Sequence, residues 1–203
     1  MAVLPEVPYD DHLGLDSRDF AGVRLVAFHG ISGSGKSTAI GRLLSHNPAF
    51  RGLPRSHITG ARIDWSCERP AGELVVLDEC KSLRDLAGLV GLLRRGHRVL
   101  AASHLPLASS RALGRIWPTV ARRTDDDPRR IERYLAARGV RFDRPRVEAA
   151  CRRFGASYAA ADLILAFDGG RDFDRAYERF IRCCRVERPA RWRLAARFGR
   201  TGR

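Results

Sequence analysis

The stretch that decides the fold of this chain is Gly30-Ile31-Ser32-Gly33-Ser34-Gly35-Lys36-Ser37-Thr38. It fits the pattern G-x-x-x-x-G-K-[ST], which wraps the phosphates of a nucleotide when it joins a strand to a helix. The apolar run 23–29 before it indicates a buried strand, and residues 39–44 after it indicate a helix. The sequence therefore predicts a strand, a glycine-rich loop and a helix, and with them a site for a triphosphate.

Each residue type in this loop has a chemical role. Gly30, Gly33 and Gly35 allow backbone N–H groups to converge on phosphate oxygens, because few Cβ atoms intervene. The helix that begins near Lys36 directs its partial positive charge at the same oxygens. We expect the Lys36 ammonium to reach the β- and γ-phosphates and the Ser37 hydroxyl to coordinate Mg²⁺.

Composition also singles out Lys36. The chain of 203 residues contains 37 Lys and Arg together, and only Lys36 and Lys81 are lysines. A chain that prefers Arg so strongly keeps a lysine where a compact ammonium on a flexible stem fits between phosphates and a planar guanidinium does not. The rarity of lysine therefore supports a phosphate-binding role for Lys36.

A second signal is the pair Asp78-Glu79 at the end of the apolar run 73–77. Such a run indicates a central strand of a parallel sheet. At the tip of this strand, Asp78 can hold Mg²⁺ through water. Glu79 is then in a position to orient or deprotonate an attacking water molecule.

A third signal is Ser103-His104, which follows the next predicted strand, 98–102. A polar side chain at that tip can contact the γ-phosphate or the attacking water. Both residues are candidates for this role, and the alternative is an ordinary loop with a capping serine.

Strands and helices alternate up to residue 125. Residues 57–59 and 61–65 predict one or two further strands, 107–115 predict a helix and 116–121 predict a short strand. Ser82–Arg95 predicts a helix with a capping box at Ser82 and Asp85 and one apolar face formed by Leu83, Leu86, Val90 and Leu93. This alternation predicts an α/β fold with three layers, α/β/α, and a mainly parallel sheet.

The pattern changes after Asp125, where four predicted helices follow one another over residues 128–138, 144–154, 158–167 and 172–184. We therefore expect a lead-in over 1–22, a core over 23–125, a small helical lid over 126–184 and a basic tail over 185–203. In the tail, Arg alternates with Trp192, Leu194 and Phe198. Such a segment could grip nucleic acid, lie on an acidic membrane or form a frayed terminus.

The net charge of +14 and the pI near 10.9 favour a polyanionic partner such as DNA or RNA. No run of about 18 apolar residues occurs, which predicts no transmembrane span, and residues 1–19 lack the apolar core of a signal peptide. The five cysteines, Cys67, Cys80, Cys151, Cys183 and Cys184, show no C-x-x-C spacing. We expect reduced thiols in a cytoplasmic protein, with Cys183 and Cys184 buried as small apolar residues.

Together, Gly30–Thr38, Asp78-Glu79 and Ser103-His104 resemble the P-loop ATPases that have an additional strand and a catalytic glutamate. That group includes AAA+ proteins, RecA-like motors and ABC ATPases, and the resemblance implies hydrolysis of ATP by water. It covers residues 22–121, and residues 128–184 are more loosely similar to the AAA+ lid. The usual AAA+ sensor is Asn where this chain has Ser103. His104 looks like the switch histidine of ABC ATPases, but their L-S-G-G-Q signature does not occur.

The AAA+ resemblance also implies two arginines that act on the γ-phosphate. One is inserted from a neighbouring subunit, which implies a homo-oligomer, and Arg115 or Arg111 occupies the corresponding region. The other belongs to the lid, where Arg152 or Arg153 is a candidate. A solvated helix face is the simpler interpretation of each of these arginines.

The guanine-reading sequence N-K-x-D does not occur, so we expect ATP rather than GTP. The first hypothesis is a Mg²⁺-dependent ATPase that couples hydrolysis to an interaction with a polyanion, above all DNA or a DNA-processing complex, or with a protein partner. The second is a small-molecule or nucleotide kinase, since this loop sequence and chain length also suit kinases. A third is a nucleotide-dependent switch with little turnover.

Overall fold

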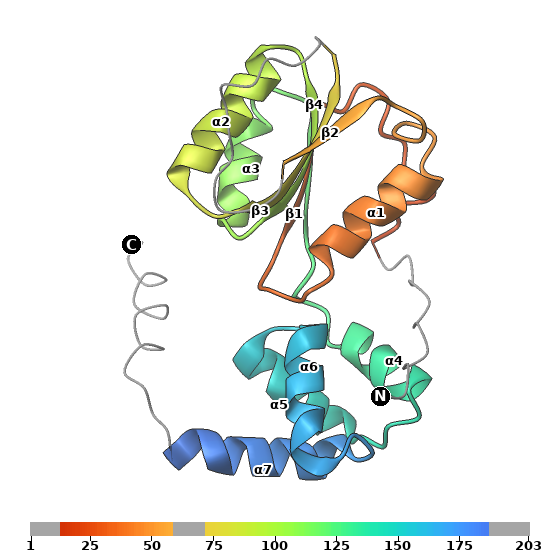
Figure 1. Ribbon diagram of the computed structural model, residues 1–203, viewed down its shortest axis with the longest axis vertical. Coiled ribbons are helices and arrows are strands. Elements are labelled where there is room, and N and C mark those ends of the chain that lie inside the picture. Colours follow the sequence, from red (N-terminus) through yellow and green to blue (C-terminus); the bar gives the residue numbers. More distant parts are fainter. Residues whose placement is uncertain (1–12, 59–71, 187–203) are drawn as a thin grey trace.

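The computed structural model describes residues 13–58 and 72–186, which form an α/β fold (Figure 1). In chain order the elements are β1 (Leu25–His29), α1 (Lys36–His46), β2 (Arg55–Ile58), β3 (Leu74–Cys80), α2 (Leu83–Arg94), β4 (Arg98–Ser103), α3 (Leu107–Leu113), β5 (Thr119–Arg123), α4 (Arg129–Ala137), α5 (Arg144–Phe154), α6 (Tyr158–Leu165), the 3₁₀ turn η1 (Ala166–Asp168) and α7 (Phe173–Val186). The predicted alternation of strands and helices, followed by helices alone, is confirmed.

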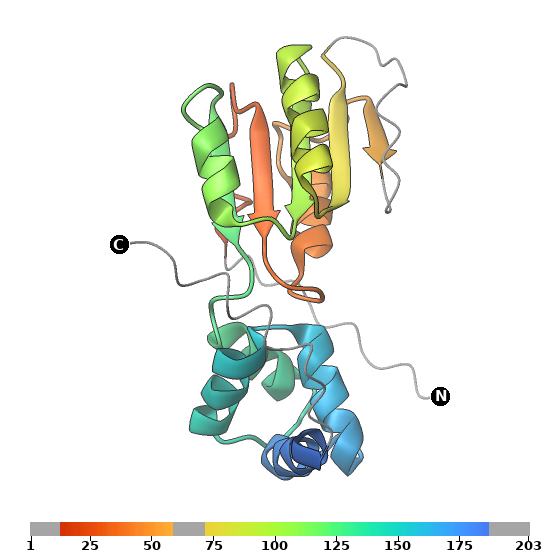
Figure 2. The same ribbon diagram turned by 90° about the vertical axis from the view of Figure 1, so that its left-hand side faces the viewer.

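The five strands form one sheet in the order β2-β3-β4-β1-β5, and every neighbouring pair is parallel. β4 therefore lies between β1, which leads into the glycine-rich loop, and β3, which carries Asp78-Glu79. Because all strands run the same way, their carboxyl ends meet at one edge of the sheet. Figure 2 shows that this edge faces the helical subdomain.

Helices cover both faces of the sheet. On one face, α1 contributes Ile40 and Leu43 to a core with Val26 and Phe28. On the other face, α2 contributes Leu89, Leu92 and Leu93 and α3 contributes Leu113 to a second core. β1 is buried at every position, since both of its faces are covered. The predicted α/β/α layers are therefore present.

Residues 13–22, which precede β1, pack into this core. Leu15 and Phe20 are fully buried beside α1. Asn47 Nδ2 donates hydrogen bonds to the carbonyl oxygens of Leu15 and Arg18, and Arg98 Nη2 donates one to that of Phe20. The core therefore begins earlier than the predicted residue 23.

Helices α4–α7 form the small subdomain, with an apolar core of its own that includes Ile131, Leu135, Val147, Ile164 and Phe173. In Figures 1 and 2 the subdomain lies beyond the carboxyl ends of the strands, next to the glycine-rich loop. The helices begin and end within a few residues of their predicted bounds. The predicted lid is therefore a folded helical unit.

Three details differ from the sequence predictions. Leu83 is exposed, because it is the first residue of α2 and the core that this helix covers begins at Leu86. Ile116 is also exposed, because residues 114–117 turn back on the end of α3 and β5 begins only at Thr119. Neither Cys183 nor Cys184 on α7 is buried as predicted, since Cys183 is exposed and Cys184 is half-buried.

Two predicted segments, Ala61–Trp65 and the basic tail from residue 187 onward, lie outside the described residues, as does Cys67. Among the helices that the structure does describe, none has the length and apolar character needed to cross a bilayer.

Candidate functional site

The glycine-rich loop joins β1 to α1 at the carboxyl edge of the sheet. Gly33 and Gly35 have φ values of 71° and 87°, in the left-handed region that disfavours other residues. Gly35 is the N-cap of α1, so the helix begins at Lys36 as predicted. Ser37 and Thr38 are exposed in the first turn, where helical N–H groups have no partner within the helix.

The loop is held by its carbonyl oxygens. Each carbonyl oxygen from residue 30 to residue 34 accepts a hydrogen bond. Lys36 Nζ donates to Gly30 O and Ile31 O. The other donors are Ser157 Oγ to Ser32 O, Tyr158 N to Gly33 O and Arg130 Nη2 to Ser34 O. Three of these donors come from the helical subdomain. The subdomain therefore packs directly against the backbone of the loop.

This pairing decides where the N–H groups point. In a trans peptide the C=O and N–H bonds point in opposite directions. The bonds from Ser157 and Arg130 therefore turn the N–H groups of Gly33 and Gly35 away from the subdomain. Together with those of Lys36 and Ser37 they donate no hydrogen bond within residues 13–58 and 72–186. This set of N–H groups is the arrangement that an anion requires.

Lys36 lies inside the curve of the loop. Its ammonium donates to Gly30 O at 2.9 Å and to Ile31 O at 2.7 Å. Burial lowers the pKa of Lys36, and the charges of Asp125, Asp78 and Glu79 act against this shift. The predicted phosphate-binding cation is thus anchored at the loop, within the electrostatic reach of Asp78 and Glu79.

Ser37 and Asp78 meet although they are far apart in the sequence. Ser37 Oγ lies 3.1 Å from Asp78 Oδ1 and 3.3 Å from Oδ2. A hydroxyl and a carboxylate in contact beside a phosphate loop fit Mg²⁺, which needs few protein ligands because phosphates and water supply the others. The described residues contain no group of three or more His, Cys, Asp or Glu side chains that could hold a metal ion.

Glu79 lies at an irregularity in the sheet. The pairing of β3 with β4 shifts between Leu77 and Cys80, and Glu79 has a φ of 63°. Its N–H donates to Asp78 Oδ1 at 3.0 Å. Bulges of this kind re-aim side chains and are frequent next to active sites. Here the bulge directs Asp78 to Ser37 and leaves Glu79 at the surface.

The carboxylate of Glu79 accepts a hydrogen bond from Lys81 Nζ at 2.8 Å, and about half of each side chain is exposed. This bond to Lys81, together with the charge of Lys81, lowers the pKa of Glu79. The candidate base is therefore ionised at neutral pH and is paired with the second of the two lysines.

The structure separates the two candidates at the tip of β4. Ser103 is buried, and its hydroxyl accepts from Leu105 N and donates to Cys80 O, so it shapes the turn. His104 is half-buried, and its pKa is lowered by burial and by the charges of Lys36 and Lys81. Neutral His104 therefore suits the predicted contact with the γ-phosphate or the attacking water better than Ser103 does.

The sequence analysis missed three residues that shape the loop. Asp125 Oδ2 accepts from Ile31 N at 3.1 Å, and Thr124 Oγ1 lies 2.7 Å from Ser34 Oγ. Arg130 is buried, donates to Thr124 O and Ser34 O, and lies over the ring of Tyr158. Thr124 and Asp125 could have been found, because they follow a predicted parallel strand. Arg130 could not, since arginine is so common in this chain.

The four candidate arginines do not contact the loop in the described chain. Arg111 is exposed in the last turn of α3, and Arg115 is exposed just after this helix. Arg152 and Arg153 are exposed on α5, where Arg152 pairs with Glu148 and Arg153 lies over Phe154. The arginine that the helical subdomain does bring to the loop is Arg130, and it binds backbone carbonyls.

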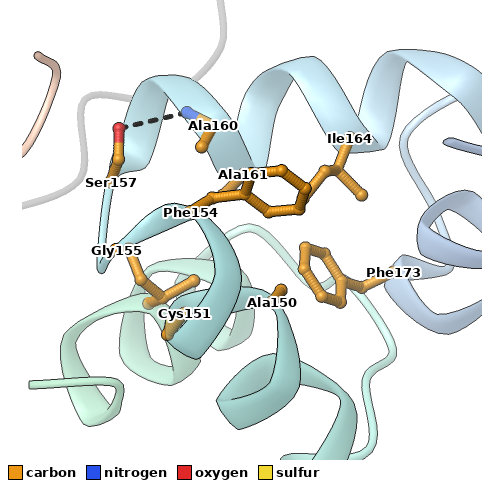
Figure 3. A pocket seen from close by; sticks show the side chains of 10 residues that line it. Ala150, Cys151, Phe154, Gly155, Ser157, Ala160, Ala161, Ile164 and Phe173 are labelled. Atoms are coloured by element: carbon orange, nitrogen blue, oxygen red, sulfur yellow. Dashed lines mark hydrogen bonds between the residues drawn. The ribbon is translucent and has the colours of Figure 1, made fainter. Parts of the chain in front are cut away.

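A small apolar cavity lies inside the helical subdomain and is not part of the loop (Figure 3). Its volume of about 10 Å³ is close to the minimum for one water molecule. At one end lie Gly155 and Ser157, and Ser157 Oγ accepts a hydrogen bond from Ala160 N. The cavity is too small for a nucleotide or an organic substrate.

Comparison with models of protein families finds no match to this chain, and comparison with curated proteins finds none either. The candidate site is therefore defined by its own geometry: the N–H groups of residues 33 and 35–37 that lack a partner in the described chain, Lys36, the pair Ser37–Asp78, and Glu79 with His104 near it.

Proposed function

We propose that this protein is a Mg²⁺-dependent ATPase of the P-loop group that has an additional strand and a catalytic glutamate, with an AAA+-like helical lid. The observation that carries the proposal is the convergence of Lys36, the pair Ser37–Asp78 and Glu79 on one loop whose N–H groups at residues 33 and 35–37 have no hydrogen-bond partner in the described chain. The position of β4 between β1 and β3 supports it, because the additional strand brings His104 to the same edge.

Each residue has a distinct part in the proposed reaction. The N–H groups of residues 33 and 35–37 and the Lys36 ammonium bind the phosphate oxygens. Ser37 and Asp78 would hold Mg²⁺, which when bound offsets negative charge on the phosphates. Glu79 accepts a proton from a water molecule whose oxygen bonds to the terminal phosphorus, while the bond from that phosphorus to the bridging oxygen breaks. Neutral His104 donates a hydrogen bond to the transferred group.

The exposure of Glu79 favours hydrolysis over phosphate transfer. Its carboxylate is at the surface and paired only with the exposed Lys81 in the described chain, so bulk water reaches it directly. A kinase holds its hydroxyl acceptor next to the base and excludes water from it. The kinase alternative therefore requires an acceptor that covers Glu79.

The decisive experiment is the substitution Glu79→Gln, which removes the base and keeps the shape. We expect phosphate release to fall by about 10²- to 10⁴-fold, while binding of a fluorescent ATP analogue remains. Lys36→Ala should weaken that binding by about 10- to 100-fold, which corresponds to losing a charge-assisted hydrogen bond. Glu178→Gln, on the exposed surface of α7, is the matched control and should change neither quantity.

Normal hydrolysis by the Glu79→Gln variant would show that the proposed base is wrong. Phosphate transfer to an added hydroxyl acceptor, with little release in its absence, would replace the ATPase proposal by the kinase. The charge of +14 supports a polyanionic partner, above all DNA, and the reduced thiols support a cytoplasmic location. The polyanionic partner and the cytoplasmic location are therefore parts of this proposal.

A further inference from the structure

A row of arginines lies at the end of the sheet opposite the glycine-rich loop. In the register of the strands, Arg55 at the start of β2 pairs with Leu74, and Leu74 pairs with Arg98 at the start of β4. Arg24 comes next, because Leu25 pairs with Val99 and Val99 N donates to Arg24 O. Three arginines thus span three strand spacings, about 14 Å, along the amino edge of the sheet.

The loops that lead into this edge bring more arginines to it. Arg51 lies between α1 and β2, Arg94 is the last residue of α2, Arg95 follows it in the connection to β4, and Arg115 lies between α3 and β5. Parallel strands joined by helices place all of these connections at the same end of the sheet, remote from the helical subdomain (Figure 2). We call this set the arginine edge: Arg24, Arg51, Arg55, Arg94, Arg95, Arg98 and Arg115.

The exposed members of the arginine edge are not neutralised by carboxylates. Arg51, Arg55, Arg94, Arg95 and Arg115 are exposed and form no ion pair within the described residues. The helical subdomain differs, since many of its exposed arginines do pair with Asp or Glu, among them Arg141, Arg144, Arg146, Arg175 and Arg179. Among the residues that the structure describes, unpaired positive charge is therefore concentrated on the core.

The two half-buried members hold the edge in place. Arg98 donates to the carbonyl oxygens of Val23, Ala49 and Phe20, and Arg24 donates to that of Leu93. Burial and the charge of Arg24 lower the pKa of Arg98, so the two guanidinium groups lie within electrostatic reach of each other. Two carboxylates of the described chain lie close to these arginines in the sequence or the sheet, those of Asp19 and Glu73. Asp19 accepts a hydrogen bond from Ala21 N.

Helix ends explain only part of this pattern. Arg94 and Arg95 at the carboxyl end of α2 favourably meet the helix dipole. Arg55 begins a strand, and Arg51 lies in a loop, so neither has that reason to be basic. A row of arginine positions that spans about 14 Å of the sheet suits a partner with closely repeated charges, and duplex DNA carries one negative charge per ~1.7 Å of axis.

We propose that the arginine edge binds the phosphate backbone of duplex DNA. This inference deepens the proposed function, since it places the polyanionic partner on a defined surface. The guanidinium fork matches phosphate oxygens in pairs. A membrane surface is less suitable, because only Leu53 and Ile116 are large exposed apolar side chains in these connections, at 36% and 70% exposure, and binding at a membrane interface strengthens with the apolar area that is buried there.

The position of the arginine edge also separates DNA from the nucleotide. β1 and β4 run from Arg24 and Arg98 at this edge to Gly30 and Ser103 at the other. Five or six residues of strand at ~3.3 Å each place the two sites more than ~15 Å apart. Changes to the exposed arginines should therefore leave ATP turnover in the absence of DNA unchanged.

The test measures binding of a fluorescent DNA duplex of random sequence to the full chain by anisotropy, at several salt concentrations. The variant R94E/R95E should bind at least ~10-fold more weakly. Its plot of log affinity against log salt should be less steep by about 0.9 for each phosphate that the variant no longer neutralises. R51Q/R55Q is a milder second variant and should show the same effect to a smaller degree.

The matched control is R129E/R171E, which changes the net charge as R94E/R95E does but on exposed arginines of the helical subdomain. It should bind DNA within about twofold of the wild type. Thermal melting of every variant identifies any loss of folding. If R94E/R95E does not fold, DNA binding by R51Q/R55Q tests the proposal in its place.

Equal weakening by the control would overturn the proposal, because binding would depend on net charge alone. Preference for phosphatidylserine vesicles over DNA would overturn it as well. Phosphate release without DNA is measured on the same samples. Absence of turnover in the wild type would contradict the proposed ATPase and leave the DNA result interpretable by itself.

Discussion

The ammonium nitrogen of Lys81 lies 2.8 Å from Oε2 of Glu79. The two lysines of this chain are therefore both at the candidate site, Lys36 within the loop and Lys81 on the candidate base. Since both members of the pair are about half exposed, the bond adds little to the stability of the fold. Its consequence is chemical, because it lowers the pKa of Glu79.

The first prediction concerns the pH dependence of ATP turnover in the variant Lys81→Met. Without the ammonium, the pKa of Glu79 rises toward its ordinary value, so the carboxylate becomes protonated at a higher pH. The acidic limb of the profile of kcat against pH should therefore move to higher pH, while the melting temperature stays nearly constant.

Arg84→Met is the control for this profile. It removes an equal charge three residues further along, from an exposed side chain that forms no hydrogen bond or ion pair with Glu79 in the described chain. A shift of the same size in both variants would show that Lys81 acts through net charge and not through its contact with Glu79.

The second prediction concerns Arg130→Met. Arg130 is buried and donates to Ser34 O, Thr124 O and the hydroxyl of Tyr158. The variant leaves two buried carbonyl groups with one hydrogen bond fewer, which should lower the free energy of unfolding by about 2–3 kcal/mol. It should also loosen the loop and raise the Kd for an ATP analogue.

Arg129→Met, at the neighbouring exposed position of α4, should change neither the denaturant midpoint nor the Kd. Urea unfolding gives the first quantity and fluorescence titration the second. An unchanged Kd in folded Arg130→Met would mean that the subdomain does not position the phosphate loop.

The third prediction compares two glycines with similar backbones. Gly33 and Gly52 have φ values of 71° and 76°, so alanine costs about 1–2 kcal/mol of backbone strain at each. A Cβ at Gly33 would lie 2.4 Å from Ala159 Cβ, whereas one at Gly52 meets nothing within 4 Å. Gly33→Ala should therefore be less stable than Gly52→Ala by a further ~1–3 kcal/mol.

Urea unfolding of both variants measures this difference, which reports the packing of α6 on the loop. Equal free energies of unfolding would indicate that α6 moves away from the loop at little cost.

The fourth prediction concerns Mg²⁺. Asp78→Asn keeps an oxygen that can accept from Ser37 Oγ but removes the negative charge. The Mg²⁺ concentration for half-maximal turnover should rise at least ~10-fold, because the cation no longer meets a carboxylate at this position. Binding of the ATP analogue without Mg²⁺ should not weaken. Asp174→Asn, in the first turn of α7, should leave the Mg²⁺ requirement unchanged.

Much of the fold follows from local patterns along the chain. The apolar runs of β1, β3 and β4 predict buried parallel strands, and the capping box at Ser82 and Asp85 marks the start of α2, as the structure confirms. The helices after Asp125 were also predictable, because glycine separates their amphipathic segments. These features depend on neighbours a few residues apart, which is what periodicity reports.

Contacts between distant residues were less predictable. Lys36, Ser37, Asp78 and Glu79 could be proposed because a known spacing links them. Arg130 and Ser157 carry no such signal, since their partners are backbone oxygens that any residue has. The bulge at Glu79 and its bond to Lys81 depend on the register between β3 and β4, which single-strand patterns do not contain.

The sequence by itself determined the glycine-rich loop, the carboxylate pair and the order of strands and helices, because motif chemistry and hydrophobic periodicity are local. Only the tertiary structure decided the strand order, the docking of the helical subdomain on the loop carbonyls and the alignment of arginines along the amino edge of the sheet. These depend on which strands become neighbours, and that is settled by packing among residues that are distant along the chain.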